Sequence, residues 1–164
     1  MTAIAFFGGT GRTGLRVLER ALAGGHEVRV LVRDSAKLGV ADSRVQVVVG
    51  DVLDAAKVGE TVAGAEVVLS LFGQVKGSPR SLQTDGTRHI VDAEGHLQVL
   101  RGSGLEWTVV RGPRLTEQLG RGTYRVGWVG VDASTQISRD DLADFILTQV
   151  HDHRSVGQLP FVSN

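Results

Sequence analysis

Three glycines at three-residue spacing, Gly8, Gly11 and Gly14, stand between a short apolar run and the start of an amphipathic helix. The run predicts a buried strand over 4–8, and leucines at helical spacing predict a helix over 13–23. Such a turn is typical of α/β proteins that bind dinucleotides, because glycine lets the backbone approach a pyrophosphate and the helix N-terminus offers N–H groups. The spacing differs from the commoner Gly-x-Gly-x-x-Gly, but its place between strand and helix favours dinucleotide binding over an ordinary tight turn.

Length, charge and cysteine content exclude several classes of protein. The chain of 164 residues is expected to form one domain, residues 1–164, with a sizeable core. Acidic and basic residues balance at 18 each, so we expect no nucleic-acid partner. The sequence has no cysteine, which excludes disulfides, thiolate zinc sites and a cysteine nucleophile. Because the first strand begins at once and no apolar run is long enough to cross a membrane, we expect a cytoplasmic protein without a membrane partner.

Apolar runs of strand length alternate with helical patterns, which favours an α/β fold with a mostly parallel sheet and helices on both faces. The expected strands are residues 4–8, 28–32, 45–50, 67–73, 107–111, 124–131 (added antiparallel) and 159–162. The expected helices are residues 13–23, 54–63, 79–101 and 139–150. Ser138 is expected to cap the last helix, with Asp141 three residues later.

Acidic residues and histidines offer only weak candidates for a metal site. The last helix begins with three aspartates, Asp140, Asp141 and Asp144. Carboxylates in the first turns of a helix are usually there because they interact favourably with the positive end of the helix dipole. The pair His151 and His153 follows in a charged segment. On the helix expected at 79–101, His89 and His96 are too far apart to share a metal, and we expect them to be solvent-facing or half-buried. No metal site is therefore expected.

Six motifs fall in the order and spacing of one protein group. They are residues 8–14 (GGTGRTG), 31–34 (LVRD), 49–52 (VGDV), 62–64 (VAG), 103–111 (SGLEWTVVR) and 137–143 (ISRDDLA). With these motifs the chain resembles the atypical short-chain dehydrogenases/reductases of the biliverdin-IXβ reductase and flavin reductase type, with the related NmrA-like NAD(P)H-binding proteins. The resemblance covers nearly the whole chain and implies a Rossmann-like, doubly wound fold.

The chain departs from this family after residue 89. The family has a fifth strand that ends in a serine-bearing loop beside the nicotinamide, followed by another helix. Here residues 90–93 run directly into 94–100, which resemble the end of that later helix. We therefore expect a sheet shortened by one βα unit, with the strand at 107–111 in the place of the absent strand. The family's serine then has no counterpart, Arg114 stands where biliverdin-IXβ reductases carry a histidine, and the Tyr-x-x-x-Lys pair of ordinary short-chain dehydrogenases is absent.

Arg33 and Asp34, at the end of the second expected strand, bear on the choice of coenzyme. An acidic residue there favours NAD by binding the ribose diol, whereas arginine accommodates a 2′-phosphate. In the resembling family this arginine binds the NADPH phosphate, so NADP(H) is favoured over NAD(H). The alternative is that Arg33 and Asp34 form an exposed ion pair of little consequence.

The resemblance and the position of strand ends together give a predicted coenzyme site. Its residues are Gly8, Thr10, Gly11, Arg12, Thr13, Gly14, Arg33, Asp51, Val52, Leu71, Phe72, Gly73, Gly112 and Pro113. The family implies that Asp51 and Val52 flank the adenine, that Gly73 passes under the nicotinamide ribose, and that Gly112-Pro113 lie beside the nicotinamide.

Two functions follow from this sequence. One is an NADPH-dependent reductase that transfers hydride to a planar acceptor such as a flavin or a tetrapyrrole-like ring, with Arg111 and Arg114 as weak candidates for pairing with the acceptor. The other is a non-catalytic NAD(P)H-binding or sensor protein of the NmrA-like type, which the loss of the substrate-walling unit favours. The exposed surface that such a loss creates predicts a homodimer.

Overall fold

The structure is a computed structural model that describes residues 1–73, 77–93, 106–128 and 133–164. It divides into two compact units, Met1–Gly104 and Leu105–Asn164, which are described separately below. The single domain expected over 1–164 stays a prediction. None of the described helices combines the length and the apolar character that crossing a bilayer requires.

The first unit is a parallel α/β layer structure. Its elements are β1 (Ala3–Phe7), α1 (Arg12–Ala23), β2 (Glu27–Val32), the 3₁₀ helix η1 (Ser35–Lys37), β3 (Val45–Val49), α2 (Ala55–Val62), β4 (Val67–Ser70) and α3 (Leu82–Ala93). The strands form one sheet in the order β3-β2-β1-β4, and all three pairings are parallel. The chain thus winds from β1 toward one edge and then crosses back to β4, as doubly wound sheets do.

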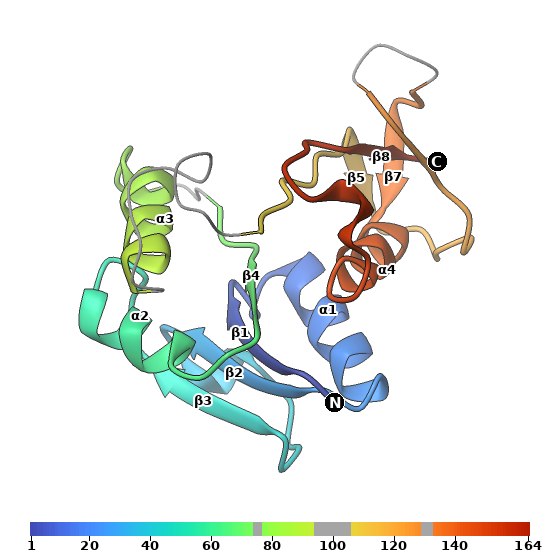
Figure 1. Cartoon of the computed structure of the whole chain (residues 1–164). Helices are drawn as coiled ribbons and strands as arrows, with labels where there is room; N and C mark the ends of the chain where they lie inside the picture. Colours follow the sequence, from blue (N-terminus) through green and yellow to red (C-terminus); the bar gives the residue numbers. More distant parts are fainter. Residues whose placement is uncertain (74–76, 94–105, 129–132) are drawn as a thin grey trace. The chain divides into compact units, whose positions relative to one another are not determined.

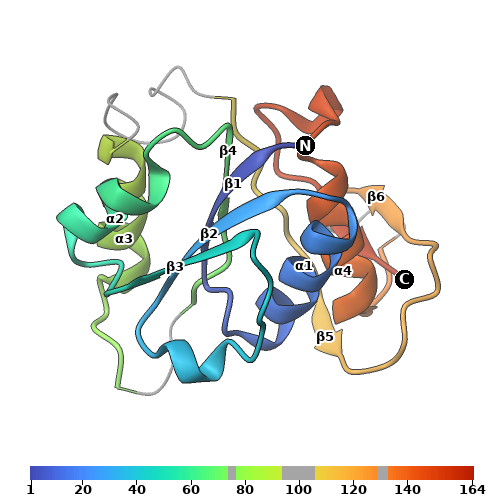
Figure 2. The same ribbon diagram turned by 90° about the horizontal axis from the view of Figure 1, so that it is seen from below.

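Alternating strand residues supply two apolar faces to this sheet. Figures 1 and 2 show α1 on one face and α2 with α3 on the other. On the face toward α2 and α3 one cluster of buried residues joins strands to helices: Ala5, Phe7, Leu31, Val48, Val58, Val62 and Ile90. The intervening strand residues, such as Phe6 and Val30, are buried on the opposite face. These layers confirm the predicted Rossmann-like α/β fold.

Two arginines bind the carboxyl ends of α1 and α2 in the first unit. Arg29, on β2, donates from Nη1 to the carbonyls of Glu60, Thr61 and Ala63 at the end of α2. Arg44 donates to the carbonyl of Leu22 in α1 at 2.6 Å. Each guanidinium supplies donors and positive charge where the helix leaves carbonyl groups without intrahelical partners.

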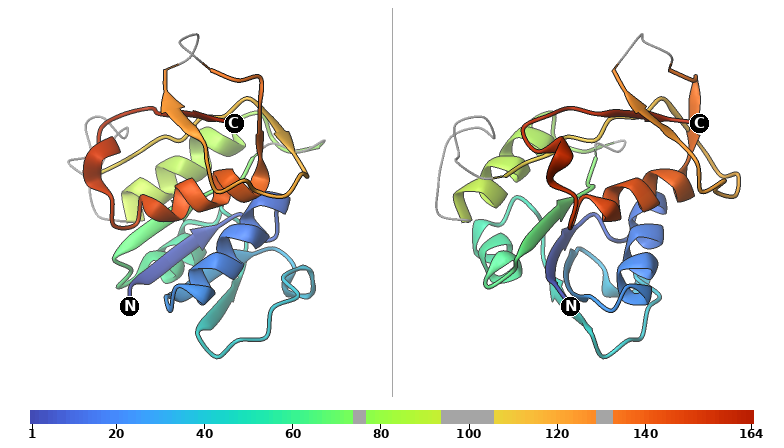
Figure 3. Two further views of the ribbon diagram at one scale, coloured as in Figure 1. Left: turned by 90° about the vertical axis from the view of Figure 1, so that its right-hand side faces the viewer. Right: turned by 45° about the vertical axis from the view of Figure 1, so that its right-hand side comes forward.

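The second unit pairs short strands beside one helix. Its elements are β5 (Arg114–Thr116), β6 (Arg125–Gly127), β7 (Gln136–Ser138), α4 (Arg139–Thr148), the 3₁₀ helix η3 (His153–Ser155) and β8 (Phe161–Ser163). β5 pairs with β7 in parallel, and β6 pairs with β8 in antiparallel orientation, as Figure 3 shows. Ile137 and Val162 from these strands pack with Leu142 and Phe145 of α4.

The prediction of a continuous strand over 107–111 is wrong, and Pro160 supplies the reason. Residues 107–111 run parallel to 158–161 but form only two isolated bridges, at Thr108 and Arg111. Val109 donates to the carbonyl of Gln158 and Arg111 to that of Pro160. In a regular parallel ladder the Val109 carbonyl would then accept a hydrogen bond from the N–H of residue 160. Proline has no N–H, so this bond is missing and the ladder is interrupted.

The short strands β5 and β7 were not predicted, and further differences concern element ends. β4 ends at Ser70 instead of 73, although the Leu71 amide still bonds to the Phe7 carbonyl at 2.8 Å. α3 begins at Leu82, after a turn closed by the Pro79 carbonyl, and the predicted continuation over 94–101 lies outside the described residues. The predicted splice of two helices falls there too, so the missing βα unit stays a prediction. The strand expected over 124–131 is described only as β6.

Candidate functional site

The turn after β1 needs glycine at its first position. Gly8 has φ 89°, in the left-handed region that side chains disfavour. A Cβ on Gly8 would lie 2.6 Å from the Phe72 amide nitrogen and 2.7 Å from the Leu71 carbonyl carbon. The turn therefore passes directly over the backbone that leaves β4, which brings two of the predicted site segments together.

Gly11 and Gly14 close this turn onto the first helix. The Gly11 amide donates to the Gly8 carbonyl at 3.1 Å, and Gly11 is the N-cap of α1. A Cβ on Gly14 would lie 2.1 Å from the Gly8 oxygen, so only glycine lets the helix approach the turn this closely. Gly8 and Gly14 thus have separate structural reasons to be glycine, and a Cβ on Gly11 would lie 3.3 Å from the Gly8 oxygen.

The start of α1 is suited to an anion. Its N-cap makes no side-chain hydrogen bond, and no acidic side chain lies in its first turn. The N-terminal N–H groups and the positive end of the helix dipole therefore meet no carboxylate of their own helix. Thr10, Arg12 and Thr13 complete this segment, with Arg12 exposed and the two threonines half-buried.

Arg33 lies just beyond β2 with its side chain exposed. The alternative of an ion pair with Asp34 is not what the structure shows. Asp34 caps η1 by accepting from the Ala36 amide at 3.1 Å, and its carboxylate lies 3.7 Å from Lys37 Nζ. Within the described ranges Arg33 makes no ion pair or side-chain hydrogen bond.

The segments after β3 and β4 are held by their own backbone and by the core. Asp51 Oδ1 accepts from the Leu53 amide at 2.9 Å, and the Asp51 carbonyl accepts from Asp54. Val52 and Phe72 pack against the apolar cluster below α2 and α3. Gly73 is exposed and has no atom within 4 Å of a Cβ position, so nothing in the chain itself requires glycine there.

Two residues of α3 hold these segments, and neither was among the predicted site residues. A Cβ on Gly86 would lie 2.8 Å from Phe72 Cζ and 3.0 Å from Val52 Cγ1. One turn further along, His89 Nδ1 lies 3.0 Å from the Val52 carbonyl oxygen. The helical spacing of three between Gly86 and His89 was visible in the sequence, but the partner residue 37 positions away was not.

The remaining predicted residues belong to the second unit. Arg111 donates from Nε and Nη2 to the Leu159 carbonyl, at 3.2 and 2.7 Å, so its guanidinium holds a backbone segment. Arg114 is exposed on β5. Gly112 approaches Ile137 Cγ2, which a Cβ would reach at 3.3 Å, and Pro113 is half-buried. The place of Gly112 and Pro113 beside a nicotinamide stays a prediction.

The aspartates of α4 have different partners from one another. Burial alone would raise the pKa of Asp141, but hydrogen bonds from the Arg121 amide, Ser138 Oγ and the Gly122 amide outweigh it and lower that pKa. Ser138 in turn caps α4, accepting from the Asp141 amide at 3.0 Å as predicted. Asp140 accepts from the Gly120 amide. These contacts tie the segment 120–122 to α4.

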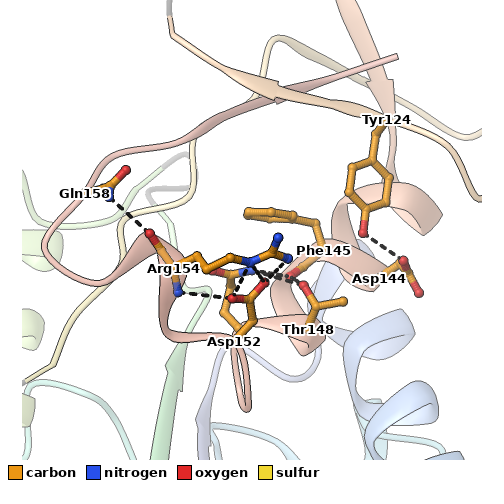
Figure 4. Close-up of polar contacts among 8 residues, drawn as sticks. Tyr124, Asp144, Phe145, Thr148, Asp152, Arg154 and Gln158 are labelled. Carbon is orange, nitrogen blue, oxygen red and sulfur yellow. Dashed lines mark hydrogen bonds and ion pairs between the residues drawn. The ribbon is translucent and has the colours of Figure 1, made fainter.

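Asp144 instead accepts from the hydroxyl of Tyr124 at 3.0 Å, as Figure 4 shows. Among the described residues no group of three or more His, Asp or Glu side chains is arranged to hold a metal ion. Each of the three α4 carboxylates accepts a hydrogen bond from the segment 120–124.

Comparison with known proteins agrees with the glycine turn. A family model described as NAD(P)H-binding matches this chain over residues 8–99 and 94–153. A Rossmann-fold NAD(P)-binding family protein from Shigella flexneri is 18% identical, with a TM-score of 0.82 over 100% of this chain and 94% of its own. An oxidoreductase from Lactococcus lactis is also 18% identical, with a TM-score of 0.78 over 99% of this chain and 90% of its own.

A third similar structure was solved with a coenzyme. It is a wide-type short-chain dehydrogenase/reductase from Veillonella parvula in complex with NADP, 16% identical, with a TM-score of 0.74 over 99% of this chain and 94% of its own. At these identities the solved structures show a shared fold. The family model goes beyond the fold, because the property that defines this family is NAD(P)H binding.

Proposed function

This chain belongs to the family of NAD(P)H-binding proteins, and we propose that it is an NADPH-dependent reductase that transfers hydride to a planar acceptor such as a flavin or a tetrapyrrole-like ring. The glycine turn carries the coenzyme part of the proposal. Gly8 and Gly14 let the turn lie against the end of β4 and against the first helix more closely than any Cβ would permit, at the start of a helix without an acidic first turn. These residues fit a dinucleotide pyrophosphate.

The described residues act by binding and positioning. The bound coenzyme supplies the hydride, and the protein's part is to hold coenzyme and acceptor in reacting geometry. The turn at 8–14 would hold the pyrophosphate, and the segments after β3 and β4 would border the nucleosides. Such a reaction does not depend on the family's serine or on the histidine that Arg114 replaces.

We propose NADP(H) over NAD(H) because of Arg33. Its guanidinium is exposed at the end of β2, while Asp34 is occupied by η1 and Lys37. Arginine binds a phosphate through two parallel N–H groups, whereas the ribose diol of NAD needs an acceptor. Arg33→Ala should therefore weaken NADPH binding much more than NADH binding. Titration of both coenzymes by calorimetry tests this, and equal losses would contradict it.

One observation favours a second candidate, a non-catalytic NAD(P)H-binding or sensor protein. Of the two arginines considered for pairing with the acceptor, Arg111 is engaged with the Leu159 carbonyl. That leaves Arg114 as the remaining candidate from the sequence. A protein that only binds the coenzyme would need neither.

Mixing the protein with NADPH and either FMN or dichlorophenolindophenol separates the two functions. Saturable loss of NADPH absorbance supports the reductase. Quenched NADPH fluorescence without turnover supports the binding protein, and the variant Gly14→Ala serves as the control that should lose both signals. The homodimer expected from the sequence stays a proposal that light scattering tests, and the mass of a single chain would contradict it.

A further inference from the structure

Helix α3 contacts two of the segments that the proposed coenzyme site uses. At Gly86 it meets Val52 after β3 and Phe72 after β4, both at distances that a single methyl group would make too short. Gly86 is buried, and Ile90 one turn later belongs to the apolar cluster shared with α2. The helix is thus anchored in the core of the first unit, and the face around Gly86 is directed at the carboxyl ends of two strands.

The hydrogen bond from His89 fixes one atom of the segment after β3. The Val52 carbonyl oxygen can only accept, so the proton of this 3.0 Å contact belongs to His89 Nδ1. Both the neutral Nδ1–H tautomer and the imidazolium form supply that donor. The bond therefore does not require a particular charge on the ring.

The rest of this segment is held by different bonds. Asp51 Oδ1 accepts from the Leu53 amide, and the Asp51 carbonyl accepts from the Asp54 amide. Asp54 is the N-cap residue of α2. These local bonds define the turn, but both of their partners lie within the turn itself. His89 bonds it to a separate element, and so sets where the turn stands relative to α3.

We propose that His89 is a positioning residue for the adenosine half of the coenzyme. By bonding the Val52 carbonyl, it holds Asp51 and Val52 where they meet that half, and Gly86 supplies the close approach that makes the bond reachable. The proposal rests on the proposed coenzyme site. It adds α3, which lies outside the glycine motif, as a determinant of coenzyme affinity.

Three variants test the hydrogen bond. His89→Leu removes the donor at similar size, His89→Asn keeps an N–H group near the Nδ1 position, and Arg88→Gln is the matched control. Arg88 neighbours His89 on α3, but its side chain is 64% exposed and pairs with Asp85 at 3.8 Å. Dissociation constants for NADPH and for 2′,5′-ADP, the probe for the adenosine half, are measured by calorimetry beside the melting temperature.

We expect His89→Leu to raise both dissociation constants by about 5-fold, the size of one ordinary hydrogen bond, while His89→Asn and Arg88→Gln stay near wild type. Gly86→Ala gives a second test without touching the donor. It should also weaken 2′,5′-ADP binding, because its methyl group would displace Val52 and Phe72. Because this displacement also reaches the apolar cluster, the melting temperature of Gly86→Ala is measured beside its affinity, and its affinity is compared at a temperature where the variant is folded.

Several outcomes would overturn the proposal. A lower melting temperature in His89→Leu with unchanged affinities would make His89 purely structural. Equal losses in His89→Leu and His89→Asn would show that ring shape, and not the donor, matters. Wild-type affinity in Gly86→Ala would likewise count against it. If wild-type protein binds neither NADPH nor 2′,5′-ADP, the proposed function itself fails, a result distinct from wild-type binding that the α3 variants leave unchanged.

Discussion

At the scale of single residues, Gly8 is under two constraints, a left-handed backbone conformation and a close approach to Phe72. Gly8→Ala would place a Cβ 2.6 Å from the Phe72 nitrogen in a residue with φ 89°. We expect a loss of about 1–3 kcal/mol in the free energy of unfolding from backbone strain, with a further loss from the clash. NADPH binding should fall with it. Urea unfolding and coenzyme titration measure the two effects.

Gly25 is the matched control for this prediction. Its φ is 78°, yet no atom lies within 4 Å of a Cβ position. Gly25→Ala should therefore cost only the left-handed conformation, about 1–2 kcal/mol, and leave NADPH affinity unchanged. Equal effects of the two substitutions on affinity would mean that the close approach at Gly8 has no part in binding.

Tyr124 gives a residue-scale prediction about pH. Desolvation first, and then the hydrogen bond to Asp144, raise the pKa of Tyr124 to about 12. Because the folded pKa lies above the unfolded value, the stabilisation is present below about pH 10 and is lost as pH rises toward 12. The chain has one tyrosine, so tyrosinate absorbance reports this group alone.

The comparison is between native and urea-unfolded protein. Native protein should ionise its tyrosine at a higher pH, and Asp144→Asn should bring the native titration closer to the unfolded one. Coincident titration curves in native and unfolded protein would contradict the burial and the hydrogen bond together.

What the sequence reveals at this scale depends on how local the cause is. The contacts of Gly11 and Gly14 with the Gly8 carbonyl and the Ser138 cap act within a few residues, and the glycine turn and the cap were both predicted. The close approach of Gly8 to Phe72 was not. The bond from His89 to Val52 spans 37 positions, and depends on how α3 packs across the ends of β3 and β4. No local pattern encodes that geometry, so His89 was expected only to be solvent-facing or half-buried.

At the scale of elements, the first unit was predicted better than the second, because its strands are set by local sequence patterns. The four strands of the first unit are mainly apolar runs of four to six residues, rich in valine in β2, β3 and β4, and their central residues were predicted correctly. β5 and β7 have three residues each, too few to give a periodic signal. Residues 107–111 do give that signal, but the missing N–H of Pro160, a residue far along the chain, interrupts the ladder.

Arg29 gives the element-scale prediction. Its guanidinium binds three carbonyls at the end of α2 and also donates to Gln46 Oε1 at 2.7 Å. Arg29→Met should lower the free energy of unfolding by about 1–2 kcal/mol, because charged hydrogen bonds and the dipole interaction at the helix end are both lost. Chemical denaturation measures this.

Arg33→Met is its control, since Arg33 follows the other end of the same strand and is exposed. It should change the free energy of unfolding by less than about 0.5 kcal/mol. If both substitutions cost the same, the bonds at the end of α2 contribute nothing specific.

At the scale of the whole molecule, the question is whether the two compact units unfold together. The glycine turn lies in the first unit, whereas Arg111 and Arg114 lie in the second. The sequence predicts one domain over 1–164, and a single domain transmits stabilisation by a ligand to all of its parts. Coenzyme binding at the turn should then protect β5–β8 and α4 as well as the parallel sheet.

Thermal unfolding with and without NADPH tests this prediction. At a coenzyme concentration of about a hundred times Kd, binding adds about 2.7 kcal/mol, which for a chain of this size raises Tm by about 5–10 °C. Trp107 and Trp128 are the chain's two tryptophans, both in the second unit, so their fluorescence reports that unit while circular dichroism reports all helices. One domain requires both signals to move together. Tryptophan fluorescence that melts at an unchanged temperature, while the helical signal shifts, would mean that the second unit unfolds independently of the coenzyme.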